Sequence, residues 1–184
     1  MAALLGTTSM EAIVITFEKR IGALERLQLA PISITSILVS KVLGGTVFGL
    51  VVSTVMALFT TLFLGAEIAD LFAFTLVLLL TNIVHSALGA LVAVSVREVF
   101  EAQTLSNYFR FPMIFLCGIF LPLDGMPVAL RYLARLLPLT YSVEALRATM
   151  TEAAGTTLLS ILILTGYSIL LLYISVTLFR RNQE

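Results

Sequence analysis

The sequence predicts an all-α integral membrane protein. We expect four full transmembrane helices plus a partial N-terminal one, a cytoplasmic amphipathic helix, and an extracytoplasmic helical hairpin before the last span. Hydrophobic residues make up 59% of the chain and charged residues 12%, whereas soluble domains have roughly 45–50% and 25%. Mean hydropathy is +1.07. Long charge-free stretches and two short amphipathic segments bounded by prolines complete the pattern.

A helix crosses the hydrocarbon core of a bilayer in about 20 mostly apolar residues. Three stretches without a charged residue meet this length, at 42–65, 71–96 and 156–179. A fourth, 102–123, can span only if Arg110 lies inside the membrane. The opening segment, 1–17, contains Glu11 and would reach about 26 Å as a helix. We expect it to be a partial span without its upstream half, and the whole chain, 1–184, to be one transmembrane domain.

Basic residues in the connections predict the orientation, because cytoplasmic segments near span ends retain Lys and Arg. Eight of the eleven fall on one side of the predicted topology: Lys19, Arg20, Arg26, Lys41, Arg97, Arg110, Arg180 and Arg181. The other side has Arg131, Arg135 and Arg147. The C-terminus and the 18–41 connection are therefore expected in the cytoplasm. Formal net charge is zero, so nothing suggests a nucleic acid as a partner, and the apolar spans make the lipid bilayer the expected surroundings.

The first amphipathic segment covers residues 18–31. Ile21, Leu24 and Leu27 recur at helical spacing between charged residues, and Pro31 lacks the amide donor that would continue a helix. Two interpretations remain open from periodicity alone. The helix lies in the headgroup layer with its apolar stripe in lipid, or it inserts into a groove on a cytosolic partner.

The second segment runs from Phe111 to Arg147. Pro127 can start a helix whose apolar stripe includes Leu133, Pro138 ends that helix, and 140–152 forms another. Two short helices on the outer side fit either an interfacial loop or a lid or re-entrant hairpin.

Both segments resemble the membrane component of the type-2 ATP-binding-cassette transporters, which are prokaryotic exporters of drugs, polysaccharides and other amphiphiles. Residues 18–31 are similar to the family's ERxxGTLERLxxAP loop, with Ala23 at the usual Thr. Residues 111–147 are similar to its FPxxFLSGxFFPxxxLPxxLxxxxxxLPLTYxxxALR signature, with Cys117 at the usual Ser and Met126 at the usual Leu. The resemblance covers roughly residues 8–180.

The resemblance implies a multi-pass permease in the inner (plasma) membrane of a prokaryote, with six spans in the family, of which the first and half of the second are missing here. The loop that docks on the ATPase would contain Glu18, Arg20, Gly22, Leu24, Glu25, Arg26 and Pro31. The outer hairpin would be an exit gate containing Pro122, Pro127, Pro138, Tyr141, Glu144 and Arg147. A second permease copy or paralogue would complete a dimer around the path of a drug, lipid-linked or polysaccharide substrate.

The energy source is expected on another polypeptide. The sequence has no Gly-x-x-x-x-Gly-Lys-Ser/Thr phosphate loop, so ATP and Mg²⁺ would bind a separate ABC ATPase subunit, and this chain is expected to be a non-catalytic transport subunit without cofactor or metal. An ion-coupled secondary transporter would need acidic or paired ionisable groups near the midplane, and the three charge-free spans have none. An intramembrane enzyme would need converging nucleophiles or carboxylates. A non-transporting assembly partner is a further alternative.

Two charged residues inside predicted spans are candidate functional residues, because an ionisable group in hydrocarbon costs several kcal/mol. Glu11 lies about 10 Å in from Glu18, and Arg110 about 12 Å in from the start of its helix. These similar depths suggest an intramembrane pair. Arg110 could instead snorkel to the inner headgroups or contact an anionic substrate. We interpret the mid-span His85 as a hydrogen-bonded packing residue, not as a proton relay.

Overall fold

The computed structural model describes residues 2–29, 31–65, 68–120, 123–150 and 154–181. Within these ranges the chain is helical, without a strand. The elements are α1 (Ala2–Arg20), α2 (Ala23–Gln28), α3 (Ile34–Leu64), α4 (Leu71–Ser95), α5 (Val99–Leu116), the 3₁₀ helix η1 (Leu123–Gly125), α6 (Val128–Arg135), α7 (Pro138–Met150) and α8 (Ala154–Arg181). The predicted all-α class is confirmed.

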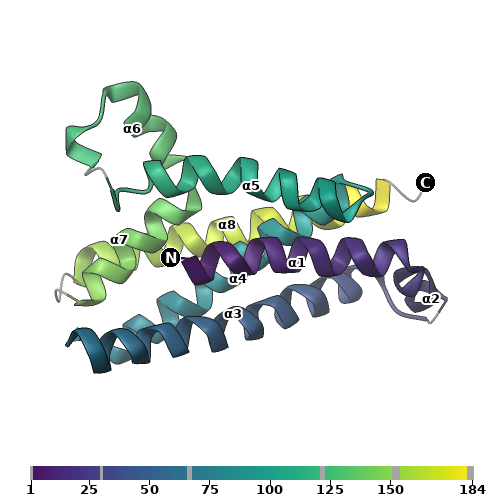
Figure 1. Ribbon diagram of the computed structural model, residues 1–184, viewed down its shortest axis with the longest axis horizontal. Coiled ribbons are helices and arrows are strands. Elements are labelled where there is room, and N and C mark those ends of the chain that lie inside the picture. Colours follow the sequence, from purple (N-terminus) through teal and green to yellow (C-terminus); the bar gives the residue numbers. More distant parts are fainter. Residues whose placement is uncertain (1, 30, 66–67, 121–122, 151–153, 182–184) are drawn as a thin grey trace.

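The long helices run alongside one another in a bundle with α4 near its centre (Figure 1). Three helices are long and apolar enough to cross a membrane, over Ile34–Leu64, Leu71–Ser95 and Leu158–Arg181. Of the most apolar window in each, 78% is buried in α4, against 11% in α3 and 17% in α8. Because α3 and α8 leave large apolar side chains such as Leu62 and Leu162 exposed, they present an outer surface suited to lipid.

Two helices have other bounds than the spans predicted for them. α3 begins at Ile34 and not at Val42, because the hydroxyl of Ser33 accepts a hydrogen bond of 3.1 Å from the amide of Ser36 and caps the helix. The helix that was predicted over 102–123 covers Val99–Leu116. It stops there because Gly118 has a φ of +83°, a left-handed conformation that ends helices. With 18 residues, α5 is about 27 Å long.

The two amphipathic segments lie at opposite ends of the bundle. Figure 1 shows α2 and the C-terminal end of α8 at one end, and α6 and α7 at the other. Pro127 precedes α6 as its N-cap. Pro138 does not merely end the preceding helix, as predicted, but is the first residue of α7, where its missing amide hydrogen costs no hydrogen bond.

Candidate functional site

The segment over 18–31 differs from the predicted single amphipathic helix. α1 continues to Arg20, and the chain then turns at Gly22, whose φ of 71° is left-handed. The following helix, α2, has only six residues. A residue with a Cβ would be strained at position 22, so the glycine permits the sharp reversal between the helices. We call residues 18–29 the α1–α2 turn.

Three consecutive side chains tie the α1–α2 turn to three other helices. Glu18 pairs with Lys41 of α3 at 2.6 Å. Lys19 donates a hydrogen bond of 3.2 Å to the carbonyl oxygen of Val96, at the end of α4. Arg20 pairs with Glu98, the N-cap of α5, at 3.0 Å. A displacement of this turn would therefore act on α3, α4 and α5 together.

The electrostatic environment of Lys19 differs from that of a free surface lysine. Burial against the bundle lowers the pKa of its ammonium group below the ordinary value of 10.5, and the nearby positive charge of Arg97 lowers it further. The ammonium keeps a hydrogen bond to the backbone in this position.

The remaining predicted docking residues are placed as follows. Arg26 is exposed, and so is Pro31, which lies beyond the end of α2. Leu24 and Glu25 belong to α2, but their side chains lie outside the described part of the chain. The exposed Arg26 and the apolar Ile21, which is 54% exposed, give this end of the protein a mixed polar and apolar surface.

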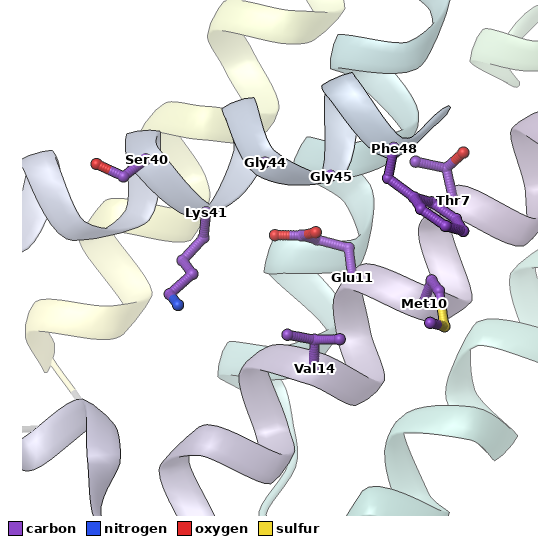
Figure 2. A pocket seen from close by; sticks show the side chains of 9 residues that line it. All are labelled: Thr7, Met10, Glu11, Val14, Ser40, Lys41, Gly44, Gly45 and Phe48. Carbon is purple, nitrogen blue, oxygen red and sulfur yellow. The ribbon is translucent and has the colours of Figure 1, made fainter. Parts of the chain in front are cut away.

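A pocket of about 320 Å³ opens between α1 and α3, close to the α1–α2 turn. Figure 2 shows the carboxyl group of Glu11 reaching from α1 toward Gly44 and Gly45 of α3, with the Lys41 side chain extending into the same space. Met10 and Phe48 supply apolar wall. Glu11 is only 6% exposed, so this pocket holds a nearly buried carboxylate.

Behind the pocket, α1, α3 and α4 pack through buried polar side chains. Thr8 donates a hydrogen bond of 3.0 Å to the carbonyl of His85, and Ser86 donates one of 2.9 Å to the carbonyl of Val42. The Nδ1 atom of His85 lies 2.8 Å from the carbonyl of Thr81. His85 is fully buried, and these contacts agree with the packing role we inferred. Polar contacts of this kind hold helices together in lipid.

Glycines allow these helices to approach closely. A Cβ added to Gly45 would collide with the side chains of Glu11 and Ser86, and one added to Gly89 would lie 2.5 Å from the backbone oxygen of Thr8. Gly44, by contrast, has open space around it and borders the pocket. The small residues thus serve close packing at two positions and leave room for the pocket at the third.

Arg110 of α5 contacts α1 on a different face from the one that carries Glu11. A guanidinium nitrogen of Arg110 donates a hydrogen bond to the hydroxyl of Ser9, two residues before Glu11 and therefore on another face of the helix. The carboxylate of Glu11 faces α3 (Figure 2). Arg110 makes further contacts beyond Ser9, so the proposed intramembrane pair remains a hypothesis.

Two arginines of the outer hairpin bind backbone carbonyls in the segment between α5 and α6. Arg131 donates from Nε to the carbonyl of Leu123 at 3.0 Å, and Arg147 donates to the carbonyl of Gly118 at 3.1 Å. The ring of Tyr141 lies 6.3 Å from that of Tyr167 on α8. Of the other predicted gate residues, Pro127 and Glu144 are exposed and Pro138 is buried, whereas Pro122 lies outside the described residues.

Several residues of the site were not identified from the sequence. Ser9, Lys19 and Glu98 have unremarkable sequence contexts, and only the packing of helices reveals their partners. The spacing of Glu11 and Glu18, two helical turns apart, was a usable signal, because residues seven apart share a face of a helix. Within the described ranges no group of three or more His, Cys, Asp or Glu side chains is placed to hold a metal ion.

Comparison with known proteins gives two findings. Residues 1–151 match the family described as ABC-2 type transporter. The chain is also 32% identical, over 151 residues, to nodulation protein J of Bradyrhizobium diazoefficiens, in an alignment that covers 77% of this chain and 52% of that protein. The chain therefore spans about half the length of this curated relative.

Proposed function

The chain belongs to the ABC-2 type transporter family, and on this premise we propose that it is the membrane permease subunit of an ATP-driven exporter. The polypeptide crosses the plasma membrane of a prokaryote with α3, α4, α5 and α8, together with α1. The α1–α2 turn and the C-terminus face the cytoplasm. A separate ABC ATPase binds ATP and Mg²⁺, and a second permease copy or paralogue completes the path for a drug, lipid-linked or polysaccharide substrate.

The observation that carries this proposal is the attachment of the α1–α2 turn. Through Glu18, Lys19 and Arg20 the turn is joined to α3, α4 and α5, while Arg26 is free of the bundle surface and exposed. An ATPase that binds at α2 and moves when its own subunits close would displace all three helices at once. Transport follows if nucleotide binds one of the two resulting states better than the other.

The outer hairpin responds to the same movement. Arg131 of α6 and Arg147 of α7 both bind carbonyl groups that follow α5 in the chain, those of Leu123 and Gly118. A shift of α5 that begins at Glu98 would therefore reach α6 and α7 at the opposite end. This mechanical link supports a role of the hairpin as the exit gate.

Co-purification tests the proposal. The tagged chain, extracted from its own membranes in mild detergent, is expected to bring down an ATPase that contains a phosphate-binding loop, identified by mass spectrometry. Exchanging the charges with Glu25→Arg and Arg26→Glu should reduce the recovered ATPase at least about tenfold, which corresponds to a loss of about 1.4 kcal/mol.

Arg181→Glu is the matched control, because it reverses an exposed charge at the same end of the protein, on α8. It should leave the recovery unchanged. The proposal fails if no ATPase is recovered, or if the double exchange on α2 recovers as much ATPase as the parent chain.

A further inference from the structure

The carboxylate in the pocket between α1 and α3 shares its neighbouring cation with a second carboxylate. Glu11 of α1 and Lys41 of α3 line the pocket, and Glu18, on the same face of α1 as Glu11, pairs with Lys41. The ammonium of Lys41 lies 2.6 Å from Glu18. One cation thus serves two carboxylates, and the nearer contact is already made to Glu18.

The carboxylate of Glu11 lies outside the Lys41–Glu18 ion pair. The charges that act on it are those of Lys41 and Glu18, and the ammonium of Lys41 is paired with Glu18. The hydroxyl of Ser86, although close to the same place, donates to the carbonyl of Val42. Burying a carboxylate is costly, so this group would gain from a cation that enters the pocket.

The walls of the pocket suit a ligand that is charged at one end and apolar at the other. Met10, Val14 and Phe48 line the pocket beside the carboxylate, and Gly44 has open space where another residue would place a side chain. A volume of about 320 Å³ lies at the lower end of the range of small-molecule sites, roughly 300–1,000 Å³. An ammonium group with an alkyl tail fits both the charge and the lining.

We propose that this pocket binds a protonated amine carried on an apolar tail, with the ammonium at Glu11 and the tail along Met10, Val14 and Phe48. The amine comes from the headgroup of an aminophospholipid or from a free cationic amphiphile. As a statement about what the exporter moves, the inference rests on the proposed function; as a statement about binding, it requires only this chain in a membrane.

Fluorescence quenching tests the binding directly. The chain has no tryptophan, so Phe48→Trp places a single reporter in the pocket wall. The probes are bromoundecylamine and, as its neutral counterpart, bromoundecanol, both added to nanodiscs of phosphatidylcholine. We expect the amine to quench at lower concentration than the alcohol. Glu11→Gln should raise the amine concentration for half-quenching at least about tenfold, the usual loss for a hydrogen bond to a charged group.

Two further variants separate binding from a purely structural role of Glu11. Glu101→Gln removes an exposed carboxylate in the first turn of α5 and should leave quenching unchanged. Lys41→Met removes the competing cation and should lower the amine concentration for half-quenching. A structural partnership of Glu11 with Lys41 predicts the reverse, namely loss of the pocket and weaker quenching in Lys41→Met.

The source of the amine is decided in discs that contain brominated phosphatidylethanolamine or brominated phosphatidylcholine. Preferential quenching by the ethanolamine lipid identifies a membrane lipid, whereas quenching by bromoundecylamine alone identifies a free amphiphile. The inference is overturned if the amine and the alcohol quench at the same concentration in the parent chain. It is also overturned if Glu11→Gln and Lys41→Met both need the same amine concentration for half-quenching as the parent chain. Because no ATPase is present, such a result leaves the permease assignment standing.

Discussion

The contact between α1 and α4 at Gly89 leaves no room for a methyl group. A Cβ at this position would lie 2.5 Å from the backbone oxygen of Thr8 and 2.8 Å from the Cβ of Glu11, whereas non-bonded carbon atoms prefer about 3.5–4.0 Å. In Gly89→Ala, α1 must therefore move away from α4 by about 1 Å. The 3.0 Å hydrogen bond from Thr8 to the carbonyl of His85 would weaken with it.

The expected cost is about 1–3 kcal/mol, the usual penalty for overpacking a close contact. Any Gly to Ala exchange inside a helix also gains roughly 0.5–1 kcal/mol of backbone entropy, so the comparison needs a control. Gly166→Ala in α8 supplies it, because a Cβ there would meet nothing within 4 Å. The difference between the two variants should be about 1–3 kcal/mol, or roughly 5- to 150-fold in the unfolding equilibrium.

Reversible unfolding by SDS in mixed micelles, followed by circular dichroism, measures this difference. Gly89→Ala should unfold at a lower SDS fraction than the parent, and Gly166→Ala at the same or a higher fraction. If Gly89→Ala is as stable as Gly166→Ala, the close approach of α1 to α4 is not a property of the folded protein, and the placement of Glu11 that depends on it is wrong.

Two further predictions concern the α1–α2 turn and its neighbour. The Glu18–Lys41 pair, with both side chains 24% exposed, should show a coupling energy of about 1–2 kcal/mol in a double-mutant cycle. The Arg20–Glu98 pair, with side chains 62% and 54% exposed, should show a coupling energy of less than about 0.5 kcal/mol, and that coupling should vanish in high salt. Equal coupling energies for the two pairs would refute the difference in environment. At the start of α5, the backbone amides of Arg97 and Glu98 donate hydrogen bonds to the carboxylate of Glu101, and these bonds hold the pKa of that carboxyl below the ordinary 4.5. The stability that these bonds give to the start of α5 is therefore present above pH 4.5 and should be lost as the pH falls through the lowered pKa. Hydrogen-exchange protection factors of these two amides should show that step, and Glu101→Gln should abolish it; a step that persists in the variant contradicts the assignment.

The long helices could be predicted from the sequence because bilayer thickness constrains them strongly. Charge-free runs of sufficient length do not occur in soluble proteins by accident, and the helices α3, α4 and α8 follow from them. Their ends were less certain, since a helix can extend beyond the membrane. Ser33 sets the start of α3 outside the apolar run, and Gly118 ends α5 within one.

The contacts between helices could not be predicted, because they depend on how each helix is rotated about its axis. A helix that is apolar on all sides carries no periodic signal for that rotation. Depth along the membrane suggested a pair of Glu11 and Arg110, but it did not indicate that Arg110 would contact Ser9 or that Glu11 would face α3. The partners of Glu18, Lys19 and Arg20 depend on the same unknown rotation.

Thiol labelling in intact cells tests the central claim, that the α1–α2 turn faces the cytoplasm and the outer hairpin faces outward. A Cys117→Ser background removes the native, buried cysteine. In this background the variants Arg26→Cys and Tyr132→Cys are treated with a membrane-impermeant maleimide. The side chain of Arg26 is exposed on α2, and that of Tyr132 is 70% exposed on α6. Position 132 should label in intact cells, and position 26 only after permeabilisation. Labelling of position 26 in intact cells, with position 132 protected, would contradict the account.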